Sequence, residues 1–170
     1  TLGIDIGSTT VKIAVLDSEQ HILFTDYERH YANIQETLVL LLSKAKEKLG
    51  EMTVSPSITG SGGLTLSGHL NVPFTQEVVA VATALQDYAP QTDVAIELGG
   101  EDAKIIYFTG GIDQRMNGIC AGGTGSFIDQ MASLLQTDAA GLNEYAKNYQ
   151  MIYPIAARCG VFAKSDIQPL

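Results

Sequence analysis

The sequence predicts an α/β fold in which short strands and amphipathic helices alternate along the chain. Segments whose apolar residues alternate at every second position are interleaved with segments whose apolar residues recur at helical spacing. A strand, an acidic residue, a glycine turn and a second strand also occur twice, at residues 3–12 and 95–104. The chain has 170 residues, of which 45% are hydrophobic, so it can form a folded core without disulfide bonds.

The expected elements alternate in type along the whole chain. In order, they are strands at 2–6, 11–16 and 21–27, a helix at 33–50, a strand at 56–60, a helix at 76–88, strands at 94–98, 103–108 and 112–116, and helices at 122–135, 138–149 and from Phe162. Asn33, with Glu36 three residues later, resembles a capping box and marks the start of the first helix. We therefore expect two antiparallel meanders, each followed by helices.

Charge and hydropathy exclude two classes of partner. The net charge of −9 leaves no basic stripe that could neutralise the phosphates of a duplex, so we expect no nucleic-acid partner. No apolar run approaches the ~20 residues of a membrane span, and Thr1 opens directly into a strand pattern without a signal peptide. The last residues lie inside an apparently continuing element, so we expect the chain to be part of a larger protein. We expect that protein to be cytoplasmic.

The first glycine turn has the composition of a phosphate-binding loop. Asp5 stands at the end of a strand, where a carboxylate can hold a metal ion or its water, and Gly7 permits a tight turn. The backbone N–H groups of the turn and neighbouring polar side chains can contact phosphate oxygens, and these side chains are Ser8, Thr9, Thr10 and Lys12. A plain β-hairpin is the alternative interpretation of this segment taken alone.

The second glycine turn repeats the arrangement of the first. Glu97 ends a strand, Gly99 and Gly100 form the turn with Glu101 beside them, and a second strand follows from Ala103. Two such turns can close on one polyphosphate from opposite sides, so the pair is much more specific than either turn alone.

The pair of turns resembles the two phosphate loops of the actin, Hsp70 and sugar-kinase superfamily. That resemblance implies ribonuclease-H-like lobes with ATP and Mg²⁺ in the cleft between them. Residues 1–90 would form the first lobe, and residues 91–170 the second phosphate loop with the start of the second lobe. Glu77 lies on a helix where this superfamily often carries the acid that orients the attacking water. The alternative is a solvated glutamate at a helix start, which the helix dipole favours.

Two cysteine segments resemble a narrower family. They are residues 115–129, which contain Cys120 followed by Gly122 and Gly123, and residues 157–166, which contain Cys159. Both look like the cysteine motifs of the ATP-dependent activators of 2-hydroxyacyl-CoA dehydratases, a family that includes benzoyl-CoA reductase ATPase subunits. The resemblance runs from residue 1 to 170 and is greatest to the long activases, which carry two ATPase domains in one polypeptide.

In that family, two such cysteines from each of two ATPase domains bind one [4Fe–4S] cluster. Cys120 precedes a glycine-rich helix start, which favours a thiolate, and Cys159 stands before another helix. Two thiolates supply half of a four-cysteine site, so a cluster requires a second domain, in a homodimer or in the same chain. A zinc site fits less well, because the three histidines are scattered along the sequence. A disulfide is not expected in the reducing cytosol. The remaining alternative is that both cysteines are small apolar residues buried in the core.

The resemblance implies an ATP-dependent redox activator. It would take an electron from a donor such as ferredoxin or flavodoxin and pass it, at low potential, to a 2-hydroxyacyl-CoA dehydratase or related reductase. These 170 residues alone are not expected to be active. Shorter activators typically have Asp at the position of Glu97 and Gln at that of Glu101, which leaves nucleotide affinity and metal choice open. The alternatives are a small-molecule kinase that uses Asp102 or another cleft acid as base, and a nucleotide-switched binding protein without a redox role.

Overall fold

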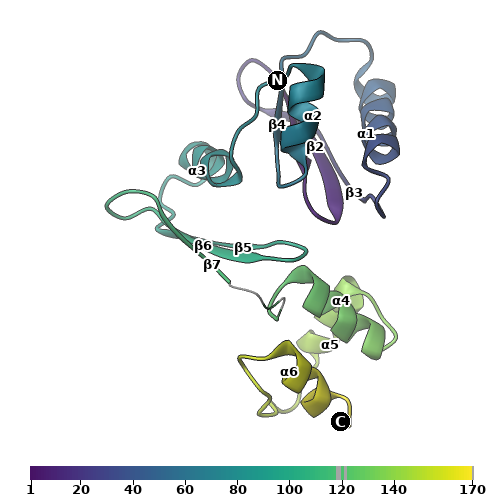
Figure 1. Ribbon diagram of the computed structural model, residues 1–170, viewed down its shortest axis with the longest axis vertical. Coiled ribbons are helices and arrows are strands. Elements are labelled where there is room, and N and C mark those ends of the chain that lie inside the picture. Colours follow the sequence, from purple (N-terminus) through teal and green to yellow (C-terminus); the bar gives the residue numbers. More distant parts are fainter. Residues whose placement is uncertain (118–119, 121, 170) are drawn as a thin grey trace. The chain divides into compact units, whose positions relative to one another are not determined.

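The computed structural model describes residues 1–117, 120 and 122–169. The chain divides into two compact units, Thr1–Thr92 and Asp93–Leu170. Each unit contains an antiparallel meander followed by helices (Figure 1).

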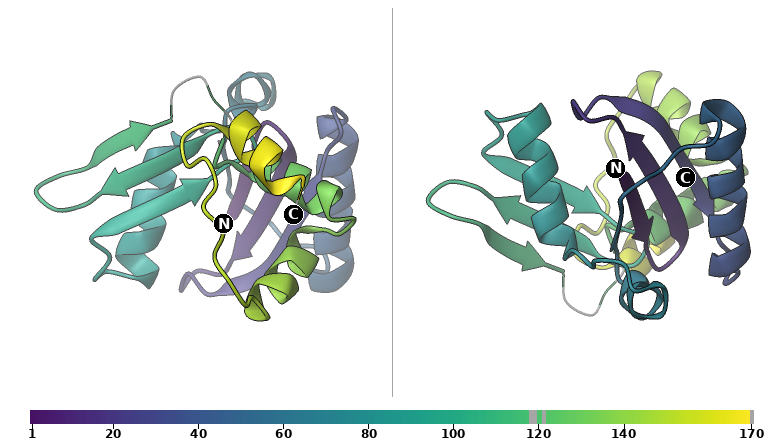
Figure 2. Two further views of the ribbon diagram at one scale, coloured as in Figure 1. Left: turned by 90° about the horizontal axis from the view of Figure 1, so that it is seen from below. Right: turned by 90° about the horizontal axis from the view of Figure 1, so that it is seen from above.

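The first unit is a four-stranded sheet with helices. Its strands are β1 (Leu2–Ile6), β2 (Thr10–Leu16), β3 (Ile22–Arg29) and β4 (Pro56–Thr59), in the spatial order β3-β2-β1-β4. β1 to β3 pair antiparallel, and β4 pairs parallel to β1. The helices are α1 (Ile34–Leu49), α2 (Gly63–Leu70) and α3 (Glu77–Tyr88). α1 packs against β2 and β3, alongside the sheet in Figure 2.

The core of the first unit lies between one face of the sheet and α1. Alternate residues of β1 and β2 are buried, as period-2 patterning predicts. Ile6, Val11, Leu41 and Ile58 are completely inaccessible to solvent. This core fixes the carboxyl end of β1, where Asp5 lies.

Two features of the first unit differ from the sequence prediction. The capping box does not form: the Asn33 side chain makes no capping hydrogen bond, and its backbone carbonyl instead accepts the Thr37 N–H (3.0 Å) and hydroxyl (2.9 Å). α2 was not predicted at all. Its first residue, Gly63, lies so close to the sheet that an added Cβ would stand 2.7 Å from Ile58 Cγ2. Close tertiary packing, rather than apolar periodicity, therefore defines this short helix.

The second unit is a three-stranded meander followed by helices. β5 (Val94–Leu98), β6 (Ala103–Tyr107) and β7 (Asp113–Met116) pair antiparallel in sequence order. α4 (Gly125–Leu134), α5 (Ala139–Lys147) and α6 (Gly160–Ile167) follow. Asp138 caps α5 by accepting the Gly141 N–H at 2.8 Å. Among the helices in the described part of the chain, none is long and apolar enough to cross a bilayer.

Candidate functional site

The first glycine turn joins β1 to β2 and is held by short local contacts. Gly7 N–H donates to the Thr10 carbonyl at 2.9 Å, which closes the turn. Asp5 and Lys12 are direct cross-strand partners, and Lys12 Nζ lies 2.7 Å from Asp5 Oδ2. Both side chains remain partly open to solvent, at 31% for Asp5 and 40% for Lys12, so both can still reach a ligand.

A glycine loop that precedes α2 packs directly on this turn. Gly62 N–H donates to the Ile6 carbonyl at 2.8 Å. Gly60 has a φ of +93° and is buried, and an added Cβ would overlap the Ile6 carbonyl group and Asp5 Oδ1. Ser61 N–H donates to Glu77 Oε1 at 3.1 Å, so the predicted acid at the start of α3 contacts this loop. The loop therefore restrains the Asp5 carboxylate, and its Ser61 N–H holds the Glu77 carboxylate.

A buried histidine supports the first turn from β3. His30 is 7% exposed, and its backbone N–H donates to the Thr9 carbonyl at 3.1 Å. The Ala32 N–H donates to His30 Nδ1 at 3.1 Å, so Nε2 carries the ring hydrogen that faces the Gly7 carbonyl at 3.3 Å. Tyr31 and Ala32 both have positive φ values, 44° and 70°, which non-glycine residues rarely adopt. Local strain thus accompanies the placement of this ring.

The second glycine turn joins β5 to β6 in the same way. Gly99 N–H donates to the Asp102 carbonyl at 2.8 Å. Glu97 and Lys104 are cross-strand partners, and Lys104 Nζ lies 3.5 Å from Glu97 Oε1 and 3.2 Å from Asp102 Oδ2. Lys104 is 8% exposed, and Glu97 Oε2 is buried without a hydrogen-bond partner among the described residues. Such an unpaired buried carboxylate oxygen fits a site that also receives a cation.

The two turns are matched position by position, 92 residues apart. Asp5, Gly7 and Lys12 correspond to Glu97, Gly99 and Lys104, with the same hairpin register and the same closing hydrogen bond. The acid is one methylene longer in the second turn, and its contact with lysine is longer as well.

The start of α4 is bound to the second turn. Gly125 N–H donates to the Gly99 carbonyl at 2.8 Å, and Ser126 N–H donates to the Gly100 carbonyl at 3.0 Å, with the Ser126 hydroxyl on the same oxygen. An added Cβ at Gly125 would lie 3.0 Å from the Gly99 oxygen, so glycine permits this approach. The helix that follows the first cysteine segment therefore rests on the second turn.

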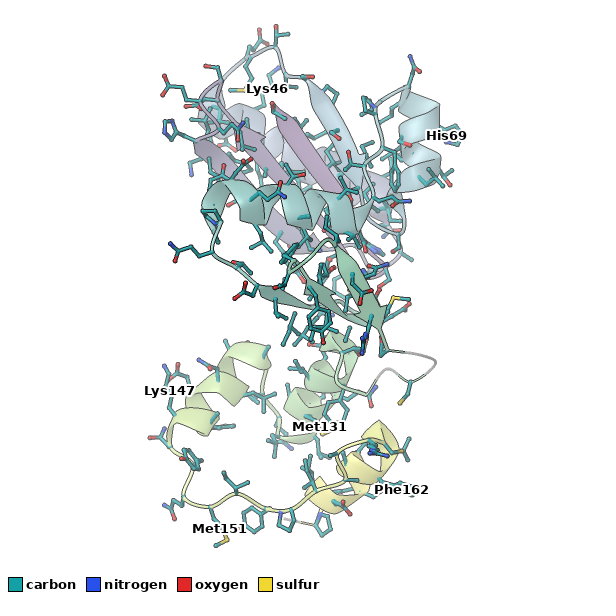
Figure 3. All side chains as sticks on the ribbon, turned by 90° about the vertical axis from the view of Figure 1, so that its left-hand side faces the viewer. Lys46, His69, Met131, Lys147, Met151 and Phe162 are labelled. Carbon is teal, nitrogen blue, oxygen red and sulfur yellow. The ribbon has the colours of Figure 1, made fainter. Side chains whose placement is uncertain are left out.

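The two cysteine segments meet at two glycines. An added Cβ at Gly122 would lie 3.0 Å from Gly160 N, and one at Gly160 would lie 3.2 Å from Gly122 Cα, so a side chain at either position would force the neighbouring backbone to move by a few tenths of an ångström. Cys159 occupies the N-cap position of α6, and Phe162, labelled in Figure 3, is exposed on the first turn of that helix. Gly118, Ile119 and Ala121 of the first cysteine motif lie outside the described residues.

The Cys120 thiol is exposed and receives backbone hydrogen bonds. Gly122 N–H donates to Cys120 Sγ at 3.4 Å. This bond, together with one from the Gly160 backbone, lowers the pKa of the Cys120 thiol below its ordinary value. Donors aimed at the sulfur suit a thiolate ligand. Among the described residues, no group of three or more His, Cys, Asp or Glu side chains gathers in the manner of a complete metal site.

The sequence matches the BadF/BadG/BcrA/BcrD ATPase family over residues 2–169. The chain belongs to this family. The 2-hydroxyisocaproyl-CoA dehydratase activator of Clostridioides difficile is 28% identical over 98% of this chain and 64% of its own length. The (R)-2-hydroxyglutaryl-CoA dehydratase activating ATPase of Acidaminococcus fermentans is 29% identical over 98% of this chain and 65% of its own length. The chain thus spans slightly less than two thirds of these relatives.

Two solved structures superpose closely on this chain. Component A of the A. fermentans (R)-2-hydroxyglutaryl-CoA dehydratase gives a TM-score of 0.81 at 29% identity, covering 98% of this chain and 65% of that one. The C. difficile 2-hydroxyisocaproyl-CoA dehydratase activator with bound ADPNP gives 0.83 at 28% identity, covering 98% and 63%. The chain has the α/β fold of the actin, Hsp70 and sugar-kinase type ATPases.

Within this family, the structure places the predicted site residues in two groups. In the first unit, the first turn carries Asp5, Gly7, Ser8, Thr9, Thr10 and Lys12, and Glu77 at the start of α3 contacts the glycine loop that packs on this turn. In the second unit lie Glu97, Gly99, Gly100 and the exposed Glu101, with Cys120, Gly122, Gly123 and Cys159 on the segments that follow.

Four residues next to these groups were given no role by the sequence analysis: Gly60, His30, Lys104 and Asn117. Of these, Lys104 had a readable signal, because an acid and a lysine seven positions apart flank the glycine in both copies of the turn. The other three act through contacts with residues distant in sequence.

Proposed function

We propose that the protein containing this chain is an ATP-dependent redox activator of a 2-hydroxyacyl-CoA dehydratase or a related reductase. The proposal has its main support in one arrangement within the second unit. The acidic glycine turn and the paired cysteine segments are joined directly, through the start of α4 and through Asn117. A phosphate-binding element and a thiolate pair in one hydrogen-bonded unit are what nucleotide-gated electron transfer needs.

The residues at the turns fit a magnesium nucleotide. Backbone N–H groups and the hydroxyls of Ser8 and Thr9 would contact phosphate oxygens at the first turn. Asp5 at the first turn is suited to a cation or its water, and so is Glu97 at the second turn, where Oε2 is unpaired among the described residues. Glu77, oriented by the Ser61 N–H, would direct the attacking water. Each acid is thus already restrained by a contact of this chain.

The cysteine segments fit half of a cluster site. Cys120 and Cys159 would each supply one thiolate, and a second ATPase domain, from the same polypeptide or from a homodimer, would supply the other two. A [4Fe–4S] cluster held there would supply one-electron transfer at low potential. The chain's own contribution is to hold both cysteine segments at Gly122 and Gly160, and to donate backbone hydrogen bonds to the Cys120 sulfur. An external donor such as ferredoxin or flavodoxin would provide the electron.

The structure gives no comparable support to a small-molecule kinase. Asp102, the acid considered as base for such a reaction, is paired with Lys104 at 3.2 Å and packs against Gly99. A carboxylate held in its own turn is poorly placed to accept a proton from a substrate hydroxyl.

An anaerobic iron and sulfide assay with an absorption spectrum tests the proposal. The full-length protein is compared with the Cys120→Ser/Cys159→Ser double variant, and ATP hydrolysis is measured for both. About four irons per pair of ATPase domains, lost in the variant, are expected. An iron-free wild-type protein that still hydrolyses ATP would refute the redox part and leave a nucleotide-switched protein. Full electron delivery to the dehydratase by the double variant would refute it as well.

A further inference from the structure

The Asn117 side chain joins the second turn to the Cys120 backbone. Asn117 directly follows β7, and its backbone N–H donates to the Ala103 carbonyl at 3.0 Å. The Ala103 N–H donates in return to Asn117 Oδ1 at 2.8 Å. On the other side of the amide, Asn117 Nδ2 donates to the Cys120 carbonyl at 2.7 Å. One side chain therefore connects the first residue of β6 with the cysteine segment.

The two contacts require an amide in one orientation. A backbone N–H needs an acceptor and a carbonyl needs a donor, so Oδ1 must face Ala103 and Nδ2 must face Cys120. Aspartate would keep the acceptor but lose the donor. Leucine would fill a similar volume but lose both. Asparagine combines both functions at this length, which makes Asn117 more than a spacer.

The Ala103 end of this bridge belongs to the nucleotide-binding turn. Asp102, the preceding residue, accepts the hydrogen bond from Gly99 that closes the turn and pairs with Lys104. A displacement of the turn when a phosphate or cation binds would therefore move the Ala103 N–H. The bridge would transmit that displacement to Cys120 by a route separate from α4.

We propose that Asn117 is the positioning residue that couples the second glycine turn to Cys120. The inference rests on the proposed function, since it assumes that a nucleotide binds at this turn. Through this one amide side chain, a displacement of the second turn would reach the backbone of Cys120.

The test compares Asn117→Asp and Asn117→Leu with wild type in the reduced, iron-free, full-length protein. The rate of Cys120 alkylation by iodoacetamide is measured by peptide mapping, with and without Mg²⁺ and ADPNP. Asp adds a charge and Leu does not, so an effect common to both comes from the lost donor. Asn148 is the matched control, because it also donates its amide to a carbonyl of the second unit (Glu144, 3.1 Å) but lies on the exposed end of α5.

In wild type, the nucleotide is expected to change the Cys120 alkylation rate. Both Asn117 variants should reduce that nucleotide effect by about 3- to 10-fold, the equivalent of one lost hydrogen bond, while calorimetric ADPNP affinity stays near wild type. The same two substitutions at Asn148 should leave the effect intact. A full nucleotide effect in both Asn117 variants would overturn the inference.

The nucleotide-free arm separates this inference from the proposed function. Without ADPNP, both Asn117 variants should alter Cys120 alkylation relative to wild type and to the Asn148 variants, because the cysteine backbone loses its support. That result, with no calorimetric binding of ADPNP to wild type, would refute the proposed function and retain Asn117 as a positioning residue. Unchanged alkylation in this arm refutes the positioning role.

Discussion

Replacement of Gly60 by alanine tests whether the loop before α2 fixes the first glycine turn. Gly60 has a φ of +93°, and an alanine Cβ there would lie 2.6 Å from the Ile6 carbonyl carbon and overlap Asp5 Oδ1. Gly50 provides a matched control. It also has a positive φ, of +78°, but an added Cβ would meet nothing within 4 Å. The two substitutions therefore share a backbone penalty and differ in the steric clash.

The difference can be estimated from these contacts. At a positive φ, which at Gly50 is combined with a ψ of −166°, an alanine costs about 1–3 kcal/mol, and both variants should lose an amount in this range. Overpacking against buried backbone costs about 1–3 kcal/mol more, and only Gly60→Ala incurs it. We therefore expect Gly60→Ala to lower the free energy of unfolding by about 2–6 kcal/mol and Gly50→Ala by about 1–3 kcal/mol.

Urea unfolding followed by circular dichroism measures both free energies, and isothermal calorimetry with Mg²⁺ and ADPNP measures binding. Because the clash displaces Asp5, Gly60→Ala should also weaken nucleotide binding, whereas Gly50→Ala should not. Equal stability losses in the two variants would show that the loop does not press on Ile6 and Asp5. Undiminished binding by a folded Gly60→Ala protein would show that the position of Asp5 does not matter for the nucleotide.

Three further predictions follow from other contacts. Lys104→Met removes the partner of the Glu97 and Asp102 carboxylates, so it should lower the free energy of unfolding in urea by about 1–3 kcal/mol. Lys12→Met breaks a half-exposed ion pair and should lower it by at most about 1 kcal/mol. His30→Gln can still donate to the first turn and His30→Asn cannot, so the Asn variant alone should lose ADPNP affinity in calorimetry. Hydrogen bonding from Lys44 lowers the pKa of Asp26. This pair therefore stabilises the protein at pH values above the ordinary aspartate pKa, and the stabilisation is lost as pH falls through the lowered pKa. In Lys44→Met, a carbon-13 NMR titration should show a higher Asp26 pKa than in wild type.

Local sequence patterns were sufficient to predict the two glycine turns. Each turn is a strand, an acid, a glycine and a second strand, so its geometry depends on residues within ten positions of each other. The strands around both turns were predicted within one or two residues of their observed bounds. The fold class follows from the same alternation, because a repeated meander with helices leaves few architectures open.

Contacts between distant segments were not predictable. Gly60 and Asp5 are 55 positions apart, and nothing in the sequence near Gly60 shows that a carboxylate lies against it. His30 follows a strand and precedes two non-glycine residues with positive φ, a turn that no propensity favours. Asn33, where the capping box does not form, directly follows these two residues. Asn117 stood inside a recognised cysteine motif, but its role depends on the Ala103 N–H across a strand pair.

The two turns differ in net charge. At the first turn, one carboxylate is matched by one ammonium, Asp5 by Lys12. The second turn carries one ammonium, Lys104, and three carboxylates, Glu97, Glu101 and Asp102, a net charge of −2. A polyphosphate brought to that turn without a cation would face like charges at short range, which costs several kcal/mol at roughly 4 Å in a partly buried site. A divalent cation would remove this repulsion and would give a partner to Glu97 Oε2, which is unpaired among the described residues. Nucleotide binding is therefore expected to depend on Mg²⁺ mainly through the second turn, where Glu97 would offer this oxygen to the cation.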